Sequence, residues 1–354
     1  MLIRQFDPSR QRITPLPDVP LNFFWELPKV GHRWIQTHAM DQSPDLRWTY
    51  LTPAHSTGSQ RVLTLRYHPL SAYSGLFRNF AATAPDRDAI KAFADRFGVL
   101  GGNLRKRIVL HDQGRGGKHP MGFGEHLGDW VHEILVMRLA VDLWESARRG
   151  DTDHLGRMIS WAPDGTAVSI NTHPELQGSE LPEAPAHVHR ALIADERIDR
   201  EILARFGPGD PIGPALHCMQ SLINEHLHHR ASPHLLWEQS RDRLGLYIVP
   251  DGLIGALWLQ FARAVERDAK FRQCPECGTW FEIAPGRGRT DKQFCSTACR
   301  TRAYRKRQAE AARLHGEGRS VEDIARELES DPDTVRGWIE RKRGSDASPQ
   351  SESE

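Results

Sequence analysis

The chain has 354 residues, of which 39% are hydrophobic and 26% charged, and it carries a formal net charge of +1. This length can hold two or three domains and supports at least one sizeable core. The first residues contain no apolar signal segment and the longest apolar stretches are interrupted by charged residues, so we expect a cytoplasmic, globular protein without a membrane-spanning helix.

The first predicted domain covers residues 1–269 and is mainly helical with minor β structure, an α+β domain. Residues 1–62 have no clear helical period, and a strand-like run follows at 61–67. Pro163-Asp164-Gly165 lies between two alternating apolar runs and predicts a β-hairpin over 158–170. The remaining expected elements are two short helices within 76–102, the second over 86–97, longer helices over 125–149, 185–206, 213–229 and 252–269, and a strand over 244–249.

Catalytic motifs are weak in this domain. The glycine-rich run 111–120 is similar to a phosphate-binding loop, but Asp112 and His119 stand where that motif requires Gly and Ser or Thr, so we interpret it as a flexible loop. Candidate acid–base residues, which no pattern brings together, are His111, Asp112, His126, Asp129 and His132. We therefore predict that the chain is not an enzyme, and sensing or formation of a homodimer remain open roles for this domain.

Four histidines lie close together at the predicted end of the helix over 213–229. They are His226, His228, His229 and His234, and such a cluster can bind a transition metal. The favoured alternative is a helix C-terminus, where the partial negative charge of the helix suits histidine.

Cysteine spacing gives the most specific signal. Cys218 stands alone, whereas Cys274, Cys277, Cys295 and Cys299 fall within one short segment. Cys274 and Cys277 have the spacing of a tight turn that points both sulfurs inward, and Cys299 lies one helical turn after Cys295, so four thiolates can surround one structural Zn²⁺. This pattern predicts a treble-clef-like zinc finger over 270–307. A redox-active pair is the alternative, but it favours a single pair inside a βαβ unit.

Positive charge is concentrated at this segment. Residues 270–307 carry ten Lys or Arg and three acidic residues, whereas residues 1–269 are nearly neutral. Clustered cations destabilise an isolated helix and favour a polyanionic partner, namely DNA or RNA; a solvated linker is the alternative. The predicted phosphate contacts are Arg287, Arg289, Arg300, Arg302, Arg305, Lys306 and Arg307.

A second small module is predicted over 308–343. Ser320 begins one helix, with Asp323 as its capping-box partner, and Asp331 caps the next helix, which begins at Pro332. Two short helices joined by a tight turn are typical of a helix-turn-helix, although modules of this size also bind proteins. The module carries seven Lys or Arg and nine acidic residues, and an acidic tail, predicted to be disordered, follows over 344–354.

The segments "SVEDIAREL" and "DTVRGWI" resemble the homeodomain-like helix-turn-helix of recombinases and transposases. This resemblance implies that the second helix reads base edges in the major groove. Its outward residues, among them Thr334 and Arg336, would make those contacts.

Residues 235–307 resemble the C-terminal half of the CGNR zinc-finger proteins. The likeness rests on the order of an apolar helix, the "CPECG" turn and the "FCSTACRTRAYRKR" segment, in which Cys299 and Arg302 match the first and last positions of the Cys-Gly-Asn-Arg signature. In that family a helical N-terminal domain, described as a stress-induced transcription regulator, precedes the finger. The resemblance implies zinc ligation and a regulatory role, and it implies no catalytic residue.

The sequence thus predicts a zinc-containing DNA-binding protein that regulates transcription. In this hypothesis the finger and basic helix contact phosphates and the C-terminal module supplies sequence preference. Two alternatives stay open: an RNA-binding or nucleic-acid-associated defence protein, and an enzyme with an appended structural zinc module.

Overall fold

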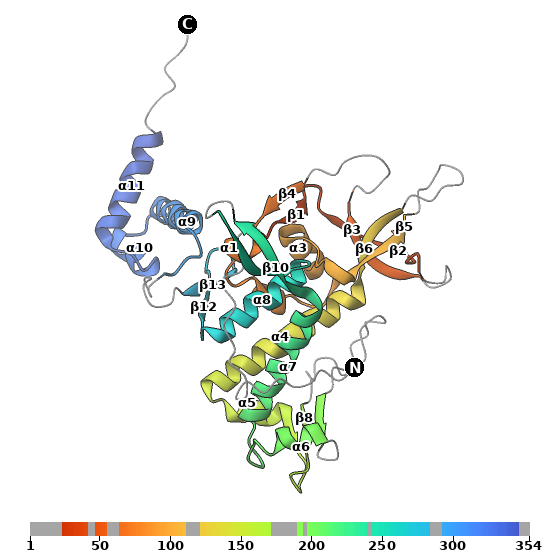
Figure 1. Ribbon diagram of the computed structural model, residues 1–354. Helices are drawn as coiled ribbons and strands as arrows, with labels where there is room; N and C mark the ends of the chain where they lie inside the picture. Colours follow the sequence, from red (N-terminus) through yellow and green to blue (C-terminus); the bar gives the residue numbers. More distant parts are fainter. Residues whose placement is uncertain are drawn as a thin grey trace. The chain divides into compact units, whose positions relative to one another are not determined.

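The computed structural model describes residues 23–41, 47–54, 64–110, 121–170, 190–193, 197–238, 242–283 and 292–346. The chain divides into two compact units, residues 1–269 and residues 270–354 (Figure 1). Helices and antiparallel strands both build the first unit, so it is an α+β structure.

The principal sheet of the N-terminal unit has four antiparallel strands in the order β2-β3-β6-β5. A separate two-stranded ribbon pairs β1 with β4. The strands are β1 (Trp25–Pro28), β2 (His32–Thr37), β3 (Trp48–Pro53), β4 (Thr64–Tyr67), β5 (Arg105–Val109) and β6 (Met121–His126). β1, β2 and β3 lie within residues 1–62, where the sequence has no helical period. The lack of a helical period there is consistent with β structure.

The helices of the N-terminal unit agree with most of the sequence predictions. They are α1 (Pro69–Ala72), α2 (Leu76–Ala81), α3 (Arg87–Phe97), the 3₁₀ helix η2 (Gly102–Leu104), α4 (Leu127–Arg149), α5 (Thr152–Met158), α6 (Arg197–Leu203), α7 (Ile212–Arg230) and α8 (Leu253–Glu266). The structure confirms the helices predicted over 86–97, 125–149, 213–229 and 252–269. Asp86 caps α3 by accepting a hydrogen bond from the Ala89 N–H at 2.8 Å.

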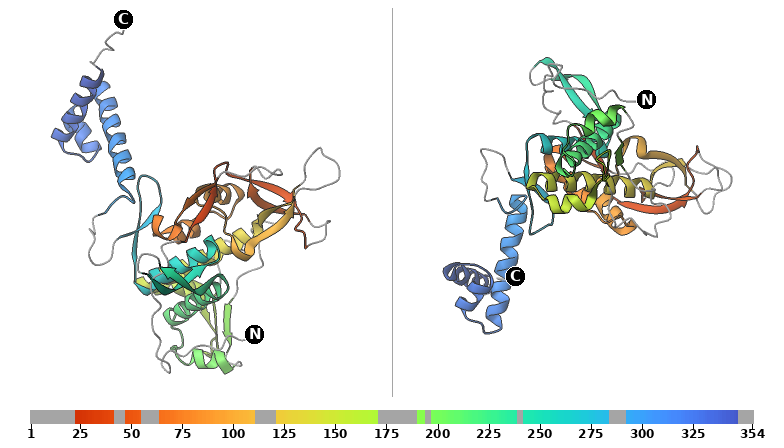
Figure 2. Two further views of the ribbon diagram at one scale, coloured as in Figure 1. Left: turned by 45° about the horizontal axis from the view of Figure 1, so that its top comes forward. Right: turned by 90° about the horizontal axis from the view of Figure 1, so that it is seen from below.

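The core of this unit forms where α4 packs against α2 and α7, and where α8 packs against α7 and α2 (Figure 2). Large aromatic side chains fill it: Trp130 of α4, Phe77 and Phe80 of α2, and Trp258 and Phe261 of α8 are all less than 2% exposed. Rings of this size contribute most of the apolar area that such a core removes from water. Helix α4 therefore lies at the centre of this core.

An ion pair between α4 and α7 lies inside this core. The Arg230 guanidinium donates two hydrogen bonds to the Glu133 carboxylate, at 2.7 and 2.5 Å, and both side chains are buried. His226 stacks on Trp258 with ring centroids 4.1 Å apart. Its Nδ1 lies 2.9 Å from the Leu222 carbonyl oxygen, and burial lowers its pKa. The buried charges of Glu133 and Arg230 compensate each other, and their hydrogen bonds fix α7 against α4.

Smaller β elements complete the unit. The hairpin predicted over 158–170 is confirmed as β7 (Ile159–Trp161) and β8 (Ala167–Ile170). The helix predicted over 185–206 is wrong in part, because β9 (Arg190–Ile193) pairs with the free edge of β8, and among the described residues of this range a helix forms at α6 alone. The predicted strand over 244–249 is confirmed as part of β11 (Arg243–Pro250), which pairs with β10 (Ala231–Glu238).

The described residues of the C-terminal unit form one hairpin and three helices. They are β12 (Lys270–Gln273), β13 (Trp280–Ile283), α9 (Thr297–Gly316), α10 (Val321–Glu327) and α11 (Pro332–Asp346). A compact apolar core joins the three helices and contains Ala311, Leu314, Ile324, Ala325, Val335, Trp338 and Ile339. The predicted caps are confirmed: Ser320 Oγ accepts from the Asp323 N–H at 3.1 Å, and Asp331 Oδ1 accepts from the Asp333 N–H at 2.9 Å. The first three residues of the predicted tail extend α11, and residues 347–354 lie outside the described residues.

Two helical glycines of the N-terminal unit predict opposite effects of alanine. A Cβ on Gly255 in α8 would lie 2.2 Å from the Arg230 carbonyl oxygen, whereas a Cβ on Gly156 in α5 has nothing within 4 Å. Because alanine favours helix over glycine, Gly156→Ala should raise the free energy of unfolding by about 0.5–1 kcal/mol. Gly255→Ala should lower it by about 1–3 kcal/mol, because a backbone contact must open. Thermal unfolding of the full chain, followed by circular dichroism, measures both. Stabilisation by Gly255→Ala would contradict the packing of α8 on the end of α7.

Candidate metal centre and basic helix

The turn between β12 and β13 presents the first pair of cysteines. The Cys274 N–H donates to the Thr279 carbonyl oxygen at 3.0 Å, and the Gly278 N–H donates to the Cys274 carbonyl oxygen at 2.8 Å. Gly278 has a φ of +69°, a left-handed conformation that glycine adopts without a steric cost. The Cys-Pro-Glu-Cys-Gly order therefore closes a tight turn that brings the sulfurs of Cys274 and Cys277 to one side.

The first turn of α9 presents the second pair. Ser296 is the N-cap residue, and its hydroxyl oxygen accepts a hydrogen bond from the Cys299 N–H at 3.2 Å. Cys295 lies just before the cap and Cys299 lies in the first turn. Capping therefore fixes the direction of the Cys299 side chain relative to Cys295, as the spacing of four residues predicts.

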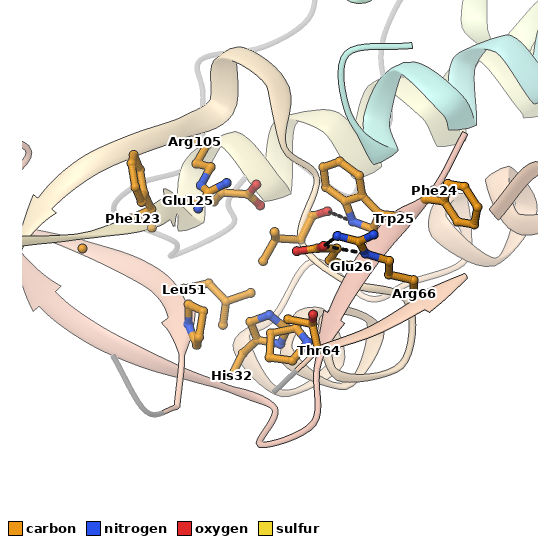
Figure 3. A pocket seen from close by; sticks show the side chains of 15 residues that line it. Phe24, Trp25, Glu26, His32, Leu51, Thr64, Arg66, Arg105, Phe123 and Glu125 are labelled. Carbon is orange, nitrogen blue, oxygen red and sulfur yellow. Dashed lines mark hydrogen bonds and ion pairs between the residues drawn. The ribbon is translucent and has the colours of Figure 1, made fainter. Parts of the chain in front are cut away.

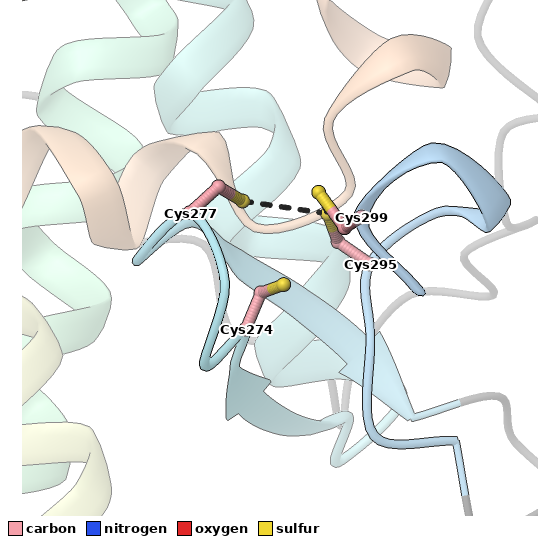
Figure 4. Close-up of side chains that lie close together, drawn as sticks. All are labelled: Cys274, Cys277, Cys295 and Cys299. Carbon is pink, nitrogen blue, oxygen red and sulfur yellow. Dashed lines mark hydrogen bonds between the residues drawn. The ribbon is translucent and has the colours of Figure 1, made fainter. Parts of the chain in front are cut away.

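All four sulfurs meet in one place (Figure 4). The Sγ atoms of Cys274, Cys277, Cys295 and Cys299 lie within 4.8 Å of one another. The Cys277–Cys295 and Cys295–Cys299 separations are 3.6 and 3.5 Å, and all four cysteines are free thiols. Sulfurs placed about 2.3 Å from one tetrahedral metal ion are about 3.8 Å apart, so this cluster has the size of a four-sulfur metal site. Within the described residues it is the one cluster with these properties.

Burial and hydrogen bonding set the acidity of these thiols. For Cys277, burial opposes ionisation, but hydrogen bonds with Thr279 and neighbouring cysteines outweigh it and lower its pKa to about 6. For Cys295, burial together with contacts to the thiols of Cys299 and Cys277 raises its pKa to about 12. A bound divalent cation offsets the repulsion between neighbouring thiolates, so the donor set fits a metal ion.

The apolar surroundings of the cluster are small. Cys274, Cys299 and Phe281 are buried together, and Phe294 packs against them half-buried. Trp280 of β13 is half-buried and lies outside this group. A core of this size cannot hold a hairpin and a helix end together without another link, and bonds from the four sulfurs to one metal ion would provide it.

Glu276, inside the cysteine turn, was missed by the sequence reasoning. Its side chain is 6% exposed, and its Oε1 lies 2.9 Å from Lys306 Nζ and 3.9 Å from Arg302 Nε. Arg302 and Lys306 are four residues apart and share one side of α9. Two of the predicted phosphate contacts therefore carry an internal partner. The position of this carboxylate between two closely spaced cysteines was the available sequence signal for this role.

Three other cations of α9 are exposed: Arg300, Arg305 and Arg307. Within the described part of the chain, none of them forms an ion pair with an acidic side chain. Arg300 and Arg307 are seven residues apart, so they lie on the same side of the helix two turns apart. Arg287 and Arg289 fall in 284–291, outside the described residues.

Helix α9 continues from the cysteine cluster into the three-helix core without interruption. Cys299 lies in its first turn, and Ala311 and Leu314 near its other end belong to the buried core with α10 and α11. Between them, the Tyr304 hydroxyl accepts a hydrogen bond from Trp338 Nε1 at 2.7 Å, and the two rings meet edge to face. Tyr304 therefore packs against α11.

The exposed start of α11 carries the predicted base-reading side chains. Thr334 and Arg336 are both exposed, and Arg336 forms an ion pair with Asp333 three residues earlier. Gly337 follows on the same helix and is half-buried. Thr334 is therefore accessible. The ion pair between Arg336 and Asp333 is exposed to solvent, so a competing ligand can replace Asp333 as the partner of Arg336 at low cost in free energy.

Other candidates from the sequence have local structural roles. His126 caps α4, its Nδ1 accepting from the Gly128 N–H at 3.1 Å, while burial raises the pKa of Asp129. His228 and His229 lie exposed in the last turn of α7, as the helix-end interpretation predicts, and His234 lies on β10. The run 111–120, with His111 and Asp112, lies outside the described residues.

Comparison of the chain with protein-family models, with curated proteins and with solved structures gave no match. Within the described residues, no helix combines the length and apolar character that crossing a membrane requires.

The cysteine cluster predicts one metal ion per chain. Elemental analysis of the purified full chain should find one equivalent, and Cys299→Ser should lose it because one of four sulfur ligands is removed. Cys218→Ser is the matched control, since Cys218 is buried in α7 outside the cluster. Full metal content in Cys299→Ser, or equal loss in both variants, would contradict the site.

Proposed function

We propose that residues 270–346 form a zinc-stabilised DNA-binding unit and that the protein regulates transcription. One observation carries the proposal: a single helix, α9, begins at the four-cysteine cluster, exposes three arginines that form no ion pair with an acidic side chain among the described residues, and ends in the core of a three-helix module. The metal ion and the module would thereby hold one basic helix from both ends.

Zinc is the metal that best suits the cluster. Four thiolates in a tetrahedron are typical of structural zinc sites, and a site with four protein ligands has no open position for a substrate. The residues that would hold it are Cys274, Cys277, Cys295 and Cys299. Its contribution would be structural, because it would join the hairpin to the first turn of α9.

Phosphate binding would come from α9. Arg300, Arg305 and Arg307 are exposed, and a guanidinium in this setting binds phosphate through two parallel N–H donors. Arg302 and Lys306 add further positive charge to the helix, where Glu276 holds them in place. Contacts of this kind position a protein on nucleic acid without reading its sequence.

Sequence preference would come from α10 and α11. The tight turn between them passes through Glu329, which has a φ of +46°, and Asp331 then caps α11. This is the local geometry expected of a helix-turn-helix, in which the second helix enters the major groove. Thr334 and Arg336 at the exposed start of α11 would reach base edges, with Arg336 released from Asp333 to contact guanine. The regulatory role agrees with the resemblance of residues 235–307 to the CGNR zinc-finger proteins.

The three exposed arginines of α9 predict a defined salt dependence. Fluorescence anisotropy of the full chain on a DNA duplex across a salt series gives the slope of log K against log salt concentration. Replacing Arg300, Arg305 and Arg307 by Ala should make this slope shallower by about 0.9 per lost phosphate contact, or about 2.7 in all. Arg313→Ala on the same helix is the control, because Arg313 is exposed but held by Glu310 and Glu317.

Three results would overturn parts of this proposal. An unchanged slope in the triple variant would remove α9 from the interface. Tighter binding to a matched RNA than to the duplex would replace DNA by RNA as the ligand. Selection from fragmented genomic DNA tests the role of α11. The DNA fragments that the full chain retains should share a sequence motif, and this motif should be lost with the Thr334→Ala/Arg336→Ala variant. Retention of fragments without a shared motif would reduce the role to nonspecific DNA binding.

A further inference from the structure

A cavity of about 610 Å³ opens in the N-terminal unit, between the β1–β4 ribbon and the principal sheet (Figure 3). This volume is in the range of sites that bind small organic molecules. Phe24 and Trp25 reach it from β1 and the residue before it, and Leu51 and Phe123 reach it from β3 and β6. Its walls are therefore mainly apolar and aromatic, and they suit a planar hydrophobic ligand.

The carboxylates on the cavity wall are already occupied. Glu125 is buried, and its two oxygens accept hydrogen bonds from the backbone N–H groups of Leu100 at 2.9 Å and Gly101 at 2.5 Å. Burial raises the pKa of Glu125 to about 7, which weakens its charge further. At the rim, Glu26 is held by Arg66 across the β1–β4 ribbon at 2.9 Å. A cationic ligand would thus find no free carboxylate among the described wall residues.

One cation on the wall remains available. Arg105 is the cross-strand neighbour of Glu125, and its guanidinium lies 4.2 Å from the centre of the Phe123 ring. Stacking on an aromatic face holds the guanidinium flat and leaves its N–H donors at the edge. Within the described residues no carboxylate is hydrogen-bonded to it. A planar carboxylate is the group that this arrangement fits.

A buried histidine supplies an acceptor on the opposite side. His32 Nδ1 lies 3.0 Å from Asp95 Oδ1, its side chain is fully buried, and its Nε2 has no hydrogen-bond partner. Burial lowers the pKa of His32, so the ring is neutral near pH 7, and the proton on Nδ1 is held by Asp95. Nε2 is then an acceptor without a donor, which is costly when buried. A hydroxyl group on a ligand would satisfy it.

We propose that this cavity binds a small aromatic carboxylic acid that carries a hydroxyl group. Its rings lie between the aromatic walls, its carboxylate pairs with Arg105, and its hydroxyl donates to His32 Nε2. The N-terminal unit would thus bind a small molecule. This proposal does not depend on the proposed role of residues 270–346.

Isothermal titration of the full chain with three related probes tests this assignment. They are 6-hydroxy-2-naphthoate, its neutral analogue 6-hydroxy-2-naphthamide, and 2-naphthoate, which lacks the hydroxyl. The hydroxynaphthoate should bind about tenfold or more tightly than either analogue, because the amide loses the negative charge that pairs with Arg105 and 2-naphthoate loses the hydroxyl that donates to His32. Arg105→Ala should weaken binding of the hydroxynaphthoate by a similar factor and leave the amide unaffected. Arg107→Ala, on the same strand but outside the cavity lining, should change neither.

Equal affinity for the hydroxynaphthoate and the amide would overturn the carboxylate assignment, and equal affinity for the two acids would overturn the role of His32. Equal effects of Arg105→Ala and Arg107→Ala would place the anion elsewhere. Absence of binding by all three probes up to about 1 mM would overturn the site itself. DNA binding is measured separately, so each of these results leaves the proposal for residues 270–346 unaffected.

Discussion

The C-terminal unit depends on the first turn of α9. There the Ser296 hydroxyl accepts the Cys299 N–H, and the Cys299 sulfur faces three others that arrive from a hairpin turn and from the residue before the cap. Only a few apolar side chains surround this junction. Hydrophobic burial at this end of α9 is small. The start of the basic helix is therefore positioned by the helix cap, and bonds from the four sulfurs to a metal ion would add to it.

The other end of α9 is held by different forces. The Tyr304 ring packs edge to face against Trp338 and its hydroxyl accepts a hydrogen bond from Trp338 Nε1. The apolar core with α10 and α11 follows about two to three turns later along α9. The helix thus links the four-cysteine cluster, which a bound metal ion would stabilise, to a core stabilised by apolar burial. In the N-terminal unit, a buried Glu133–Arg230 pair plays the comparable part by joining α4 to α7.

Local features were predictable from the sequence, and contacts between distant segments were not. The Cys-x-x-Cys turn, the Ser320 and Asp331 caps and the apolar spacing of α4 each depend on residues within one or two turns. The cavity depends on His32, Arg105 and Glu125, which three different strands bring together. In the same way, β9 replaced part of a predicted helix because β8 offered it an edge. No local pattern reports such pairings.

We propose that the cysteine cluster positions the basic helix α9 to bind nucleic acid. The most direct test compares the DNA affinity of the full chain after metal is removed under reducing conditions with its affinity after one equivalent of zinc is restored. We expect removal to weaken binding by about tenfold or more and zinc to restore it. Unchanged affinity in the metal-free chain would contradict the claim.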